Sequence, residues 1–231
     1  MAKKVTDLKK AAEVKADSKF VVSDISSKGI KAILGGVRLN WPFLATPKQD
    51  TKNPLKAQYR LQAILGNGEK EFIAGLKKAC EQYLMTAAVA WGGDVRTKVL
   101  KQMFTLDVDK SFFKTVQVDG VDCIVINAHS TVTRDSESEP FAAKYPPRLI
   151  LADGSQPASV ADAEKEFYSG VYADVAVWIQ AYDVDGSKGI SVYLNGVRKL
   201  ADGERIAGEI DPFAGTAPTA LPAPLKAKAL L

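Results

Sequence analysis

Residues 171–182 read VYADVAVWIQAY, and two kinds of side chain alternate along this stretch. One face carries only aliphatic side chains: Val171, Ala173, Val175, Val177, Ile179 and Ala181. The other face carries three large rings among small or polar residues: Tyr172, Trp178 and Tyr182. Strict alternation predicts a β-strand whose aliphatic face lies in the core.

The strand has a predicted hairpin partner. Asp185-Gly186 is a two-residue turn signal, and the alternation resumes over residues 188–197. There Ile190 and Leu194 belong to the core face, whereas Tyr193 points to the same side as the three rings. The hairpin therefore adds a fourth ring to the face opposite the core.

The rest of the chain predicts more strands than helices. We expect strands over residues 35–41, 58–65, 121–133 and 146–151. We expect an amphipathic helix near 69–91, a second helix over 94–103 and a helical turn over 161–167. Residues 104–120 look irregular up to the turn signal at Asp119-Gly120, and 135–139 form an acidic loop. A strand-rich body with a helix after its second strand fits a small Greek-key barrel with additions.

The two ends of the chain differ from this body in composition. Residues 1–28, rich in Lys, Ala, Asp and Ser, are expected to form a flexible N-terminal arm. Residues 29–211 form one domain without a linker-like break. Residues 212–231 are rich in Pro and Ala, and we expect a flexible C-terminal tail.

Composition bounds the function without deciding it. The net charge of +4 and pI of about 8.9 over 231 residues permit a polyanionic partner but do not require one. The two cysteines, Cys80 and Cys123, and the single histidine, His129, lack metal-site spacing, so we expect no metal and no cofactor. Phosphate-loop, dinucleotide, nucleophile-elbow and zinc-protease motifs are missing, so we assign no catalytic residue and expect no enzyme. No apolar span or secretory signal stands out, which favours the cytoplasm over a membrane.

The ring-bearing face is a candidate binding surface. Side chains on one face of a strand stand ~6.6 Å apart, and exposed rings at that spacing can stack on the bases of an extended nucleic acid. Basic residues beside them suit phosphate contacts. The candidate DNA-binding residues are Tyr59, Arg60, Tyr172, Trp178, Tyr182, Lys188, Tyr193, Arg198, Lys199 and Arg38. The same pattern also fits rings that form a second core layer beneath a helix.

A family resemblance bears on this choice. The blocks FYSGVYADVAVWIQAY (167–182), GSKG (186–189), LNGVRKL (194–200) and DGER (202–205) resemble a family of bacteriophage single-stranded DNA-binding proteins. That family is distantly similar to the T7-type phage protein. RLNWPFLATP (38–47), Tyr59 with its strand and Ile126-Asn-Ala128 also look like the family, so the resemblance covers about residues 30–208.

The resemblance implies an OB-fold and sequence-independent binding of single-stranded DNA in phage replication, recombination and repair, inside the bacterial host cytoplasm. It adds Tyr168 to the candidate stacking residues. T7-type proteins end in an acidic tail that docks replication partners, whereas residues 212–231 hold two lysines and no acidic residue. Replication or recombination partners are therefore a weaker expectation, and this tail could extend binding to duplex DNA.

Two other functions stay open from the sequence. A structural or protein-interaction β-barrel would ignore nucleic acid and bury the rings in an interface. A nuclease or hydrolase would need a carboxylate cluster or a metal site.

Overall fold

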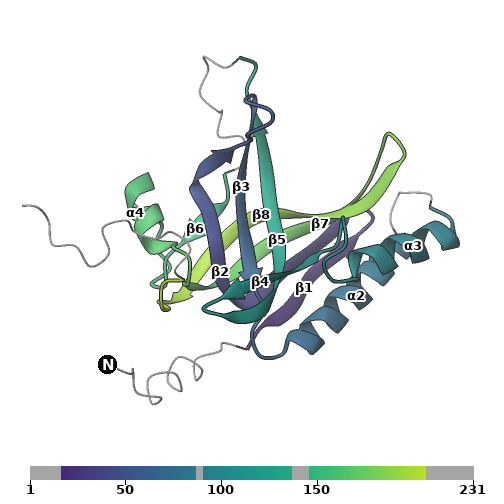
Figure 1. Cartoon of the computed structure of the whole chain (residues 1–231), viewed down its shortest axis with the longest axis horizontal. Helices are drawn as coiled ribbons and strands as arrows, with labels where there is room; N and C mark the ends of the chain where they lie inside the picture. Colours follow the sequence, from purple (N-terminus) through teal and green to yellow (C-terminus); the bar gives the residue numbers. More distant parts are fainter. Residues whose placement is uncertain (1–16, 87–90, 137–145, 207–231) are drawn as a thin grey trace, which may run out of the picture.

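Five strands of the chain close into a barrel (Figure 1). The structure is a computed structural model that describes residues 17–86, 91–136 and 146–206. The barrel strands are β2 (Gly29–Gln49), β3 (Lys56–Ile64), β5 (Val121–Thr133), β7 (Tyr172–Val184) and β8 (Ser187–Ala201). They follow the order β5-β3-β2-β7-β8, and a parallel pairing of β5 with β8 closes the circle. Both features are those of the OB-fold, so the predicted fold class is confirmed.

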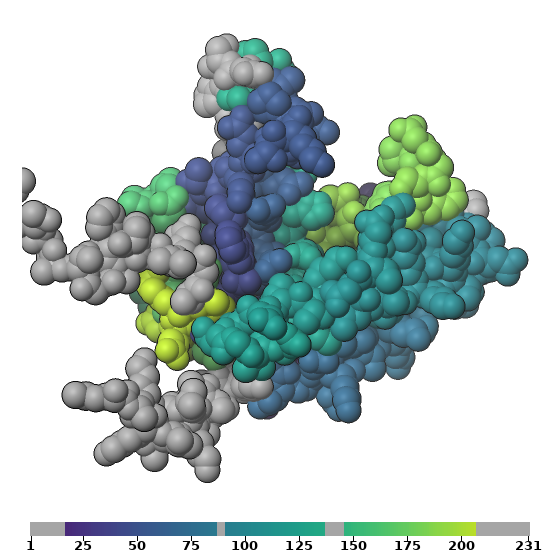
Figure 2. Space-filling model, viewed as in Figure 1, coloured from purple at the N-terminus to yellow at the C-terminus, as the bar shows by residue number. Residues whose placement is uncertain are grey.

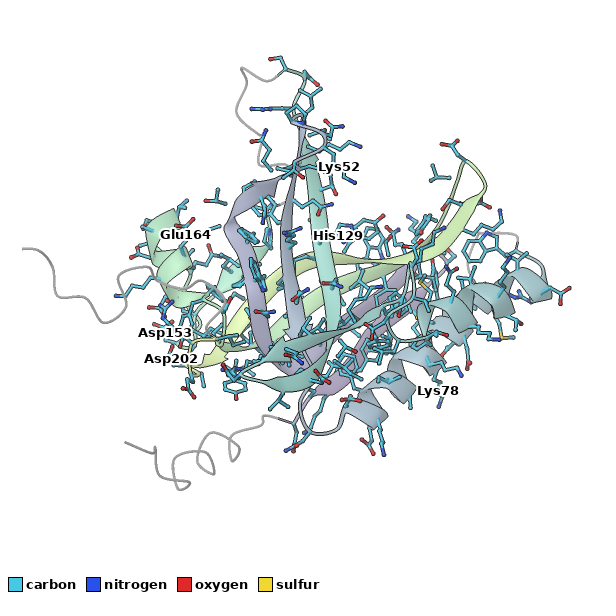
Figure 3. The ribbon with its side chains drawn as sticks, in the orientation of Figure 1. Lys52, Lys78, His129, Asp153, Glu164 and Asp202 are labelled. Carbon is cyan, nitrogen blue, oxygen red and sulfur yellow. The ribbon has the colours of Figure 1, made fainter. Side chains whose placement is uncertain are left out.

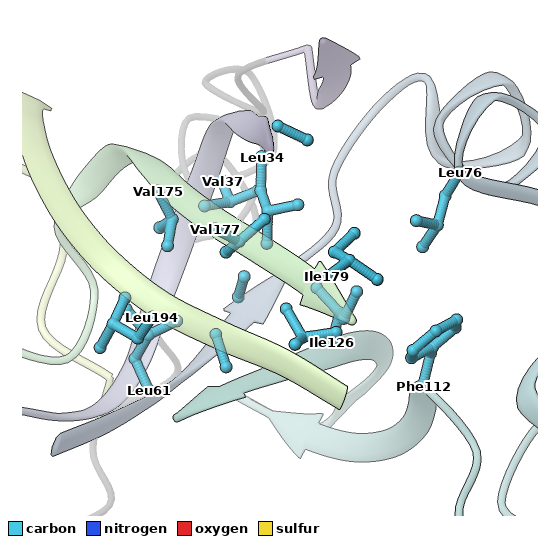
Figure 4. Packing of buried hydrophobic residues seen from close by; sticks show 14 of the residues in the cluster. Leu34, Val37, Leu61, Leu76, Phe112, Ile126, Val175, Val177, Ile179 and Leu194 are labelled. Carbon is cyan, nitrogen blue, oxygen red and sulfur yellow. The ribbon is translucent and has the colours of Figure 1, made fainter. Parts of the chain in front are cut away.

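The aliphatic row of β7 forms the centre of the core, as its alternation predicts. Ala173, Val175, Val177 and Ile179 are at most 1% exposed. Leu34, Leu61, Ile126 and Leu194 from the other four strands face them across the barrel interior (Figure 4). Each fully buried side chain of this size stabilises the fold by roughly 1.5–3 kcal/mol.

Two hairpins turn through two residues each, as the sequence predicts. Asp119 and Gly120 have φ of 52° and 79°, and Asp185 and Gly186 have φ of 49° and 76°. Paired positive φ values match the right-handed twist of the flanking strands, and Asp-Gly adopts them at little cost. The second turn is the tip of the long β7–β8 hairpin in Figure 1.

Further elements surround the barrel. They are β1 (Lys19–Ser26), α2 (Glu69–Thr86), α3 (Gly93–Met103), β4 (Phe113–Val118), β6 (Arg148–Ile150) and α4 (Val160–Glu166). α2 packs over β1, where the rings of Phe20 and Phe72 meet edge to face at 5.6 Å. α4 lies at the other end of the barrel, beside β2 (Figure 1). Both helix groups leave the outer face of β3 and β5 uncovered.

Three sequence-based expectations need correction. Residues 19–26 of the expected arm form β1, which pairs antiparallel with β2, because Phe20 and Ile25 supply apolar contacts that the polar composition conceals. The helix expected near 69–91 does not include Trp91, and its described part spans Glu69–Thr86. Residues 104–120, expected to be irregular, contain β4, which pairs with β5. Residues 1–16, most of the acidic loop and the tail 212–231 lie outside the described residues.

Two negative findings concern the described residues only. None of their helices has both the length and the apolar character needed to cross a bilayer. They also bring together no group of three or more His, Cys, Asp or Glu side chains suited to a metal ion.

Candidate nucleic-acid interface

One row of side chains runs across the barrel strands on their outer face. Strand register pairs Phe43 with Arg60, Arg60 with His129, His129 with Tyr193, Tyr193 with Trp178, and Trp178 with Lys31. Directly paired residues share a face of the sheet. We call these six residues the outer row; it follows the barrel wall from β2 back to β2, and its four rings include three consecutive ones, His129, Tyr193 and Trp178, flanked by Arg60 and Lys31 on strands ~4.8 Å apart.

The outer row is accessible because the residues beside it fill the interior. Leu61, Ala128, Val192 and Val177 are at most 4% exposed, and all of them face the core. Period-2 alternation therefore leaves the row residues on the outside, half-buried against each other or exposed. The face of β7 that the sequence marked as non-core is confirmed as such, and the described helices pack mainly on β1, β2 and β8 rather than on β3 or β5.

Trp41 joins this surface through a break in the strand ladder. β2 and β3 lose their regular pairing between Asn40 and Phe43, and Trp41 has a φ of 50°. Its backbone N–H donates to Ser169 Oγ at 3.1 Å, which holds this conformation. Trp41 is 45% exposed, although Val37 and Leu39, which precede it at period-2 spacing, are fully buried. The irregularity thus turns the indole from the core to the outer face.

The Trp41 indole and polar side chains of β3 and β5 line a pocket together. The pocket has a volume of about 330 Å³ and lies over β3 and β5, opposite Trp41. Its polar lining comes from Gln58, Arg60, Gln62, Asn127 and His129. That volume is at the lower end of the roughly 300–1,000 Å³ found for ligand sites.

Two cations lie over the rings at this end of the barrel. The Lys48 ammonium is 5.0 Å from the centroid of Phe43 and 5.9 Å from that of Trp41. The Arg60 guanidinium is 5.4 Å from the centroid of Phe43. Such contacts orient the cations over the rings and leave their hydrogen-bond donors available for phosphate oxygens.

Two projections flank the outer face. The β2–β3 loop is held by Asp50, whose carboxylate accepts the N–H groups of Lys52 and Asn53; these two bonds hold the pKa of Asp50 below its usual value. On the β7–β8 hairpin, Lys188 donates to Asp183 at 2.5 Å. Figure 2 shows the surface hollowed between the two projections, and Figure 3 shows His129 between them, with Lys52 at the tip of the loop. OB-folds bind oligonucleotides on the equivalent strands and loops.

His129 occupies the middle of the outer row. Its ring centroid is 6.1 Å from that of Tyr193, its partner on β8. Burial lowers the pKa of His129 below its usual value of 6.5, so the imidazole is neutral at pH 7. A neutral imidazole offers one donor and one acceptor beside the pocket.

Eight of the ten predicted site residues fall into three groups. Arg60, Trp178 and Tyr193 meet in the outer row. Tyr182 and Lys188 lie on the β7–β8 hairpin that flanks it, with the Tyr182 ring over Gly189. Tyr172, Arg198 and Arg38 lie toward the far end of these strands, about six residues or ~20 Å from Trp178 in the case of Tyr172.

Two predicted site residues are wrong. Tyr59 is 4% exposed and belongs to the core, because its position on β3 has the opposite parity to Arg60. Lys199 is 7% exposed and pairs with Glu166 at 2.5 Å and Asp202 at 2.7 Å. Burial alone would lower the pKa of Lys199, but its bonds to Asp202 and Glu166 outweigh burial and raise that pKa.

Three other candidates have structural partners. Arg38 donates to the carbonyl oxygens of Gly170 and Glu204, which tie the chain before β7 to the segment after β8. Arg198 contacts Asp174 at 2.5 Å, although its side chain is 57% exposed. The Tyr168 hydroxyl has two acceptors within reach of its one proton, the Gly203 carbonyl at 2.9 Å and Asp202 Oδ1 at 3.1 Å, and the Arg205 guanidinium is 4.2 Å from its ring.

Sequence reasoning missed part of the surface: Trp41, Phe43, Lys48, Gln58, Gln62, Asn127 and His129. Pro42 was the available signal for Trp41, because a proline cannot donate to a ladder and marks an irregularity in a strand. The cross-strand row itself depends on long-range register, which local patterns do not contain.

Comparisons with known proteins bear on the whole chain. A family model described as Enterobacter phage Enc34, ssDNA-binding protein, matches residues 30–217. No curated protein matches the sequence. The matching solved structures described below share at most 17% of their residues with this chain, so their likeness concerns the fold alone.

The C-terminal truncation of the single-stranded DNA-binding protein from bacteriophage Enc34 matches with a TM-score of 0.51 and 16% identity, over 81% of this chain and 98% of that one. The same phage protein in complex with ssDNA gives 0.50 and 17%, over 81% and 98%. The single-stranded DNA-binding protein gp2.5 of bacteriophage T7 gives 0.46 and 12%, over 87% and 95%.

Proposed function

Because the chain belongs to the Enterobacter phage Enc34 family of ssDNA-binding proteins, we propose that it binds single-stranded DNA across the outer face of its barrel, without catalysis. The observation that carries the proposal is the outer row, in which Arg60, Tyr193 and Trp178 stand on three strands of one continuous surface. A polynucleotide that follows the row crosses the strands and meets the rings of His129, Tyr193 and Trp178 between the positive charges of Arg60 and Lys31.

Binding divides into two physical contributions. Stacking of a base on an aromatic ring is worth roughly 1–3 kcal/mol and tolerates any sequence, because every base has a π-face. Trp178, Tyr193 and Trp41 are the rings in position for it. Lys48 and Arg60 supply phosphate contacts, whose strength falls with salt as counterions are released.

Tryptophan fluorescence tests the proposal directly. The chain has three tryptophans; Trp91 is 6% exposed and Trp41 is 45% exposed, so Trp41 and Trp178 should report the ligand. We expect oligo-dT to quench emission, and Trp178→Leu to weaken binding by more than about 1 kcal/mol. Met85→Ala, which removes an apolar side chain on α2 that is 77% exposed, is the control. Unaltered emission at saturating oligo-dT, together with no retardation in a gel, would contradict the proposal.

The finer roles rest on the family. Service in phage replication, recombination and repair, within the cytoplasm of the bacterial host, and contacts with replication or recombination proteins belong to the proposal. The flexible behaviour of residues 1–16 and 212–231 belongs to the proposal as well, and so does a single domain that extends the predicted range 29–211 by β1. Deleting residues 212–231 should weaken duplex binding, since the deletion removes two lysines. A barrel that serves only protein interaction would show no retardation of any nucleic acid.

A further inference from the structure

The pocket beside Trp41 has a volume of about 330 Å³ and combines the indole with a polar lining. We infer that one nucleobase of the bound strand enters this pocket, and that its hydrogen-bond donors favour keto bases (thymine, uracil, guanine) over amino bases (cytosine, adenine). The inference rests on the proposed function and deepens it. Stacking alone is indifferent to the base, so a preference must come from the polar lining.

Gln62 shares a side-chain hydrogen bond with a buried amide. Asn40 is 5% exposed, and its Nδ2 donates to Gln62 Oε1 at 2.8 Å. Because Asn40 uses the oxygen, Gln62 presents Nε2, which carries two N–H donors, to a ligand in the pocket it lines. A buried amide therefore orients a half-buried one.

Arg60 adds donors on the same strand. It stands two residues from Gln62, on the same face of β3, and its guanidinium can only donate. Gln58 lies two residues before Arg60 on β3. Its Nε2 donates to Thr131 Oγ1 at 3.4 Å, which leaves Oε1 as an acceptor. Along β3 the pocket thus offers an acceptor and then two donor groups.

This arrangement of donors and acceptor along β3 distinguishes bases by their exocyclic group. Thymine and uracil carry an O4 acceptor where cytosine carries an N4 amino donor, and guanine carries O6 where adenine carries N6. A keto oxygen accepts from Gln62 Nε2 or Arg60. An amino group at that position would set donor against donor and lose its water without replacement.

Oligo-dU and oligo-dC of equal length test the inference, because they share size and stacking area and differ only along the Watson–Crick edge, in the group at position 4 and in the proton on N3. At pH 8, where the single His129 is neutral, we expect dU to bind at least about threefold more tightly than dC, the worth of one net hydrogen bond. Gln62→Glu keeps an oxygen for Asn40 but replaces the donor with an acceptor. The dU-to-dC affinity ratio should then fall to one or below, whatever the loss common to both ligands.

Gln82→Glu on the exposed face of α2 carries the same charge change away from the pocket and should preserve the ratio. Equal affinities for dU and dC in the wild-type protein, or a ratio that Gln62→Glu does not change, would overturn the inference while leaving single-stranded DNA binding intact. Failure of both oligonucleotides to bind would instead overturn the proposed function.

Discussion

The rings of His129 and Tyr193 lie 6.1 Å apart, on two strands whose pairing to each other is confined to this residue pair. β5 and β8 are the strands that close the barrel, and they are parallel where the neighbouring barrel pairings are antiparallel. The closure point of the fold and the centre of the outer row are therefore the same place. A substitution of His129 or Tyr193 can therefore affect both the closure of the barrel and the surface of the outer row.

Replacing the ring of Tyr193 should weaken DNA binding. Tyr193→Leu keeps apolar bulk beside His129 but removes the π-face, so we expect a loss of about 1–3 kcal/mol in affinity for oligo-dT. Fluorescence anisotropy of a labelled oligonucleotide measures it. Leu106→Ala, at a site 42% exposed on the α3–β4 connection, is the control. If Tyr193→Leu bound as tightly as the wild type, Tyr193 would have no stacking role.

Lys48 should account for one phosphate contact. Its ammonium lies over Phe43 and Trp41 and leaves its donors to solvent or ligand. Lys48→Ala should lower affinity and reduce the slope of log affinity against log salt by about 0.7, the value for one phosphate of a single strand. Titrations at four salt concentrations give the slope. Lys77→Ala, on the exposed side of α2, should leave it unchanged; an identical slope for Lys48→Ala would exclude the contact.

Unlike Lys48, Lys199 should contribute to the stability of the fold and not to DNA binding. Its side chain is 7% exposed between Glu166 and Asp202, so Lys199→Met removes the partner of two carboxylates. We expect a loss of stability of about 1–3 kcal/mol with oligo-dT affinity kept. Urea denaturation and anisotropy on the same preparation separate the two effects. A stable Lys199→Met protein with weakened binding would restore Lys199 to the interface.

The contrast between Lys48 and Lys199 illustrates which features of the fold and the site can be predicted from the sequence. Alternation over residues 171–182 gives the core face and the outer face of β7 correctly, because parity is a local property. Parity also places Tyr59 correctly, on the apolar face of β3; its assignment to the binding surface followed the family resemblance and went against the alternation. Lys199 looks like any basic residue beside a strand until Glu166, 33 residues earlier, is brought against it.

Trp41 shows a different limit. Its spacing from Val37 and Leu39 predicts a core residue, and the prediction fails because the ladder is interrupted between Asn40 and Phe43. The composition of β1 conceals its strand in a similar way, since pairing with β2 and cover from α2 supply the stability that its own side chains lack. Both cases are decided by contacts made far away in the sequence.

His129 should give the fold a pH dependence of its own. Burial sets its folded-state pKa below the unfolded value of about 6.5, so the unfolded chain binds the proton more readily. Its contribution to stability is complete above pH 6.5 and is lost as the pH falls through the lowered folded-state pKa. Thermal melts from pH 7.5 down to 5 should show this decline. Because His129 is the single histidine, His129→Gln should flatten the curve in that window; an unchanged curve would assign the decline to carboxylates.

Gly29 should govern the position of Trp178. Gly29 has a φ of 150°, and a Cβ added there would lie 2.3 Å from the Trp178 indole nitrogen and 2.7 Å from the Ile179 carbonyl oxygen. Gly29→Ala must therefore move the indole, the backbone or both, at a cost of about 1–3 kcal/mol in stability. We expect a shift in tryptophan emission and weaker binding of oligo-dT, because the ring leaves its place beside Tyr193.

Gly93→Ala provides the matched control for this substitution. An added Cβ at Gly93 meets nothing within 4 Å, so the same chemical change should alter neither emission nor affinity. A Gly29→Ala protein that is less stable but keeps wild-type emission and affinity would show that the strain is absorbed by β2. In that case the indole position, and with it the role of Trp178 in the outer row, would not depend on the glycine beneath it.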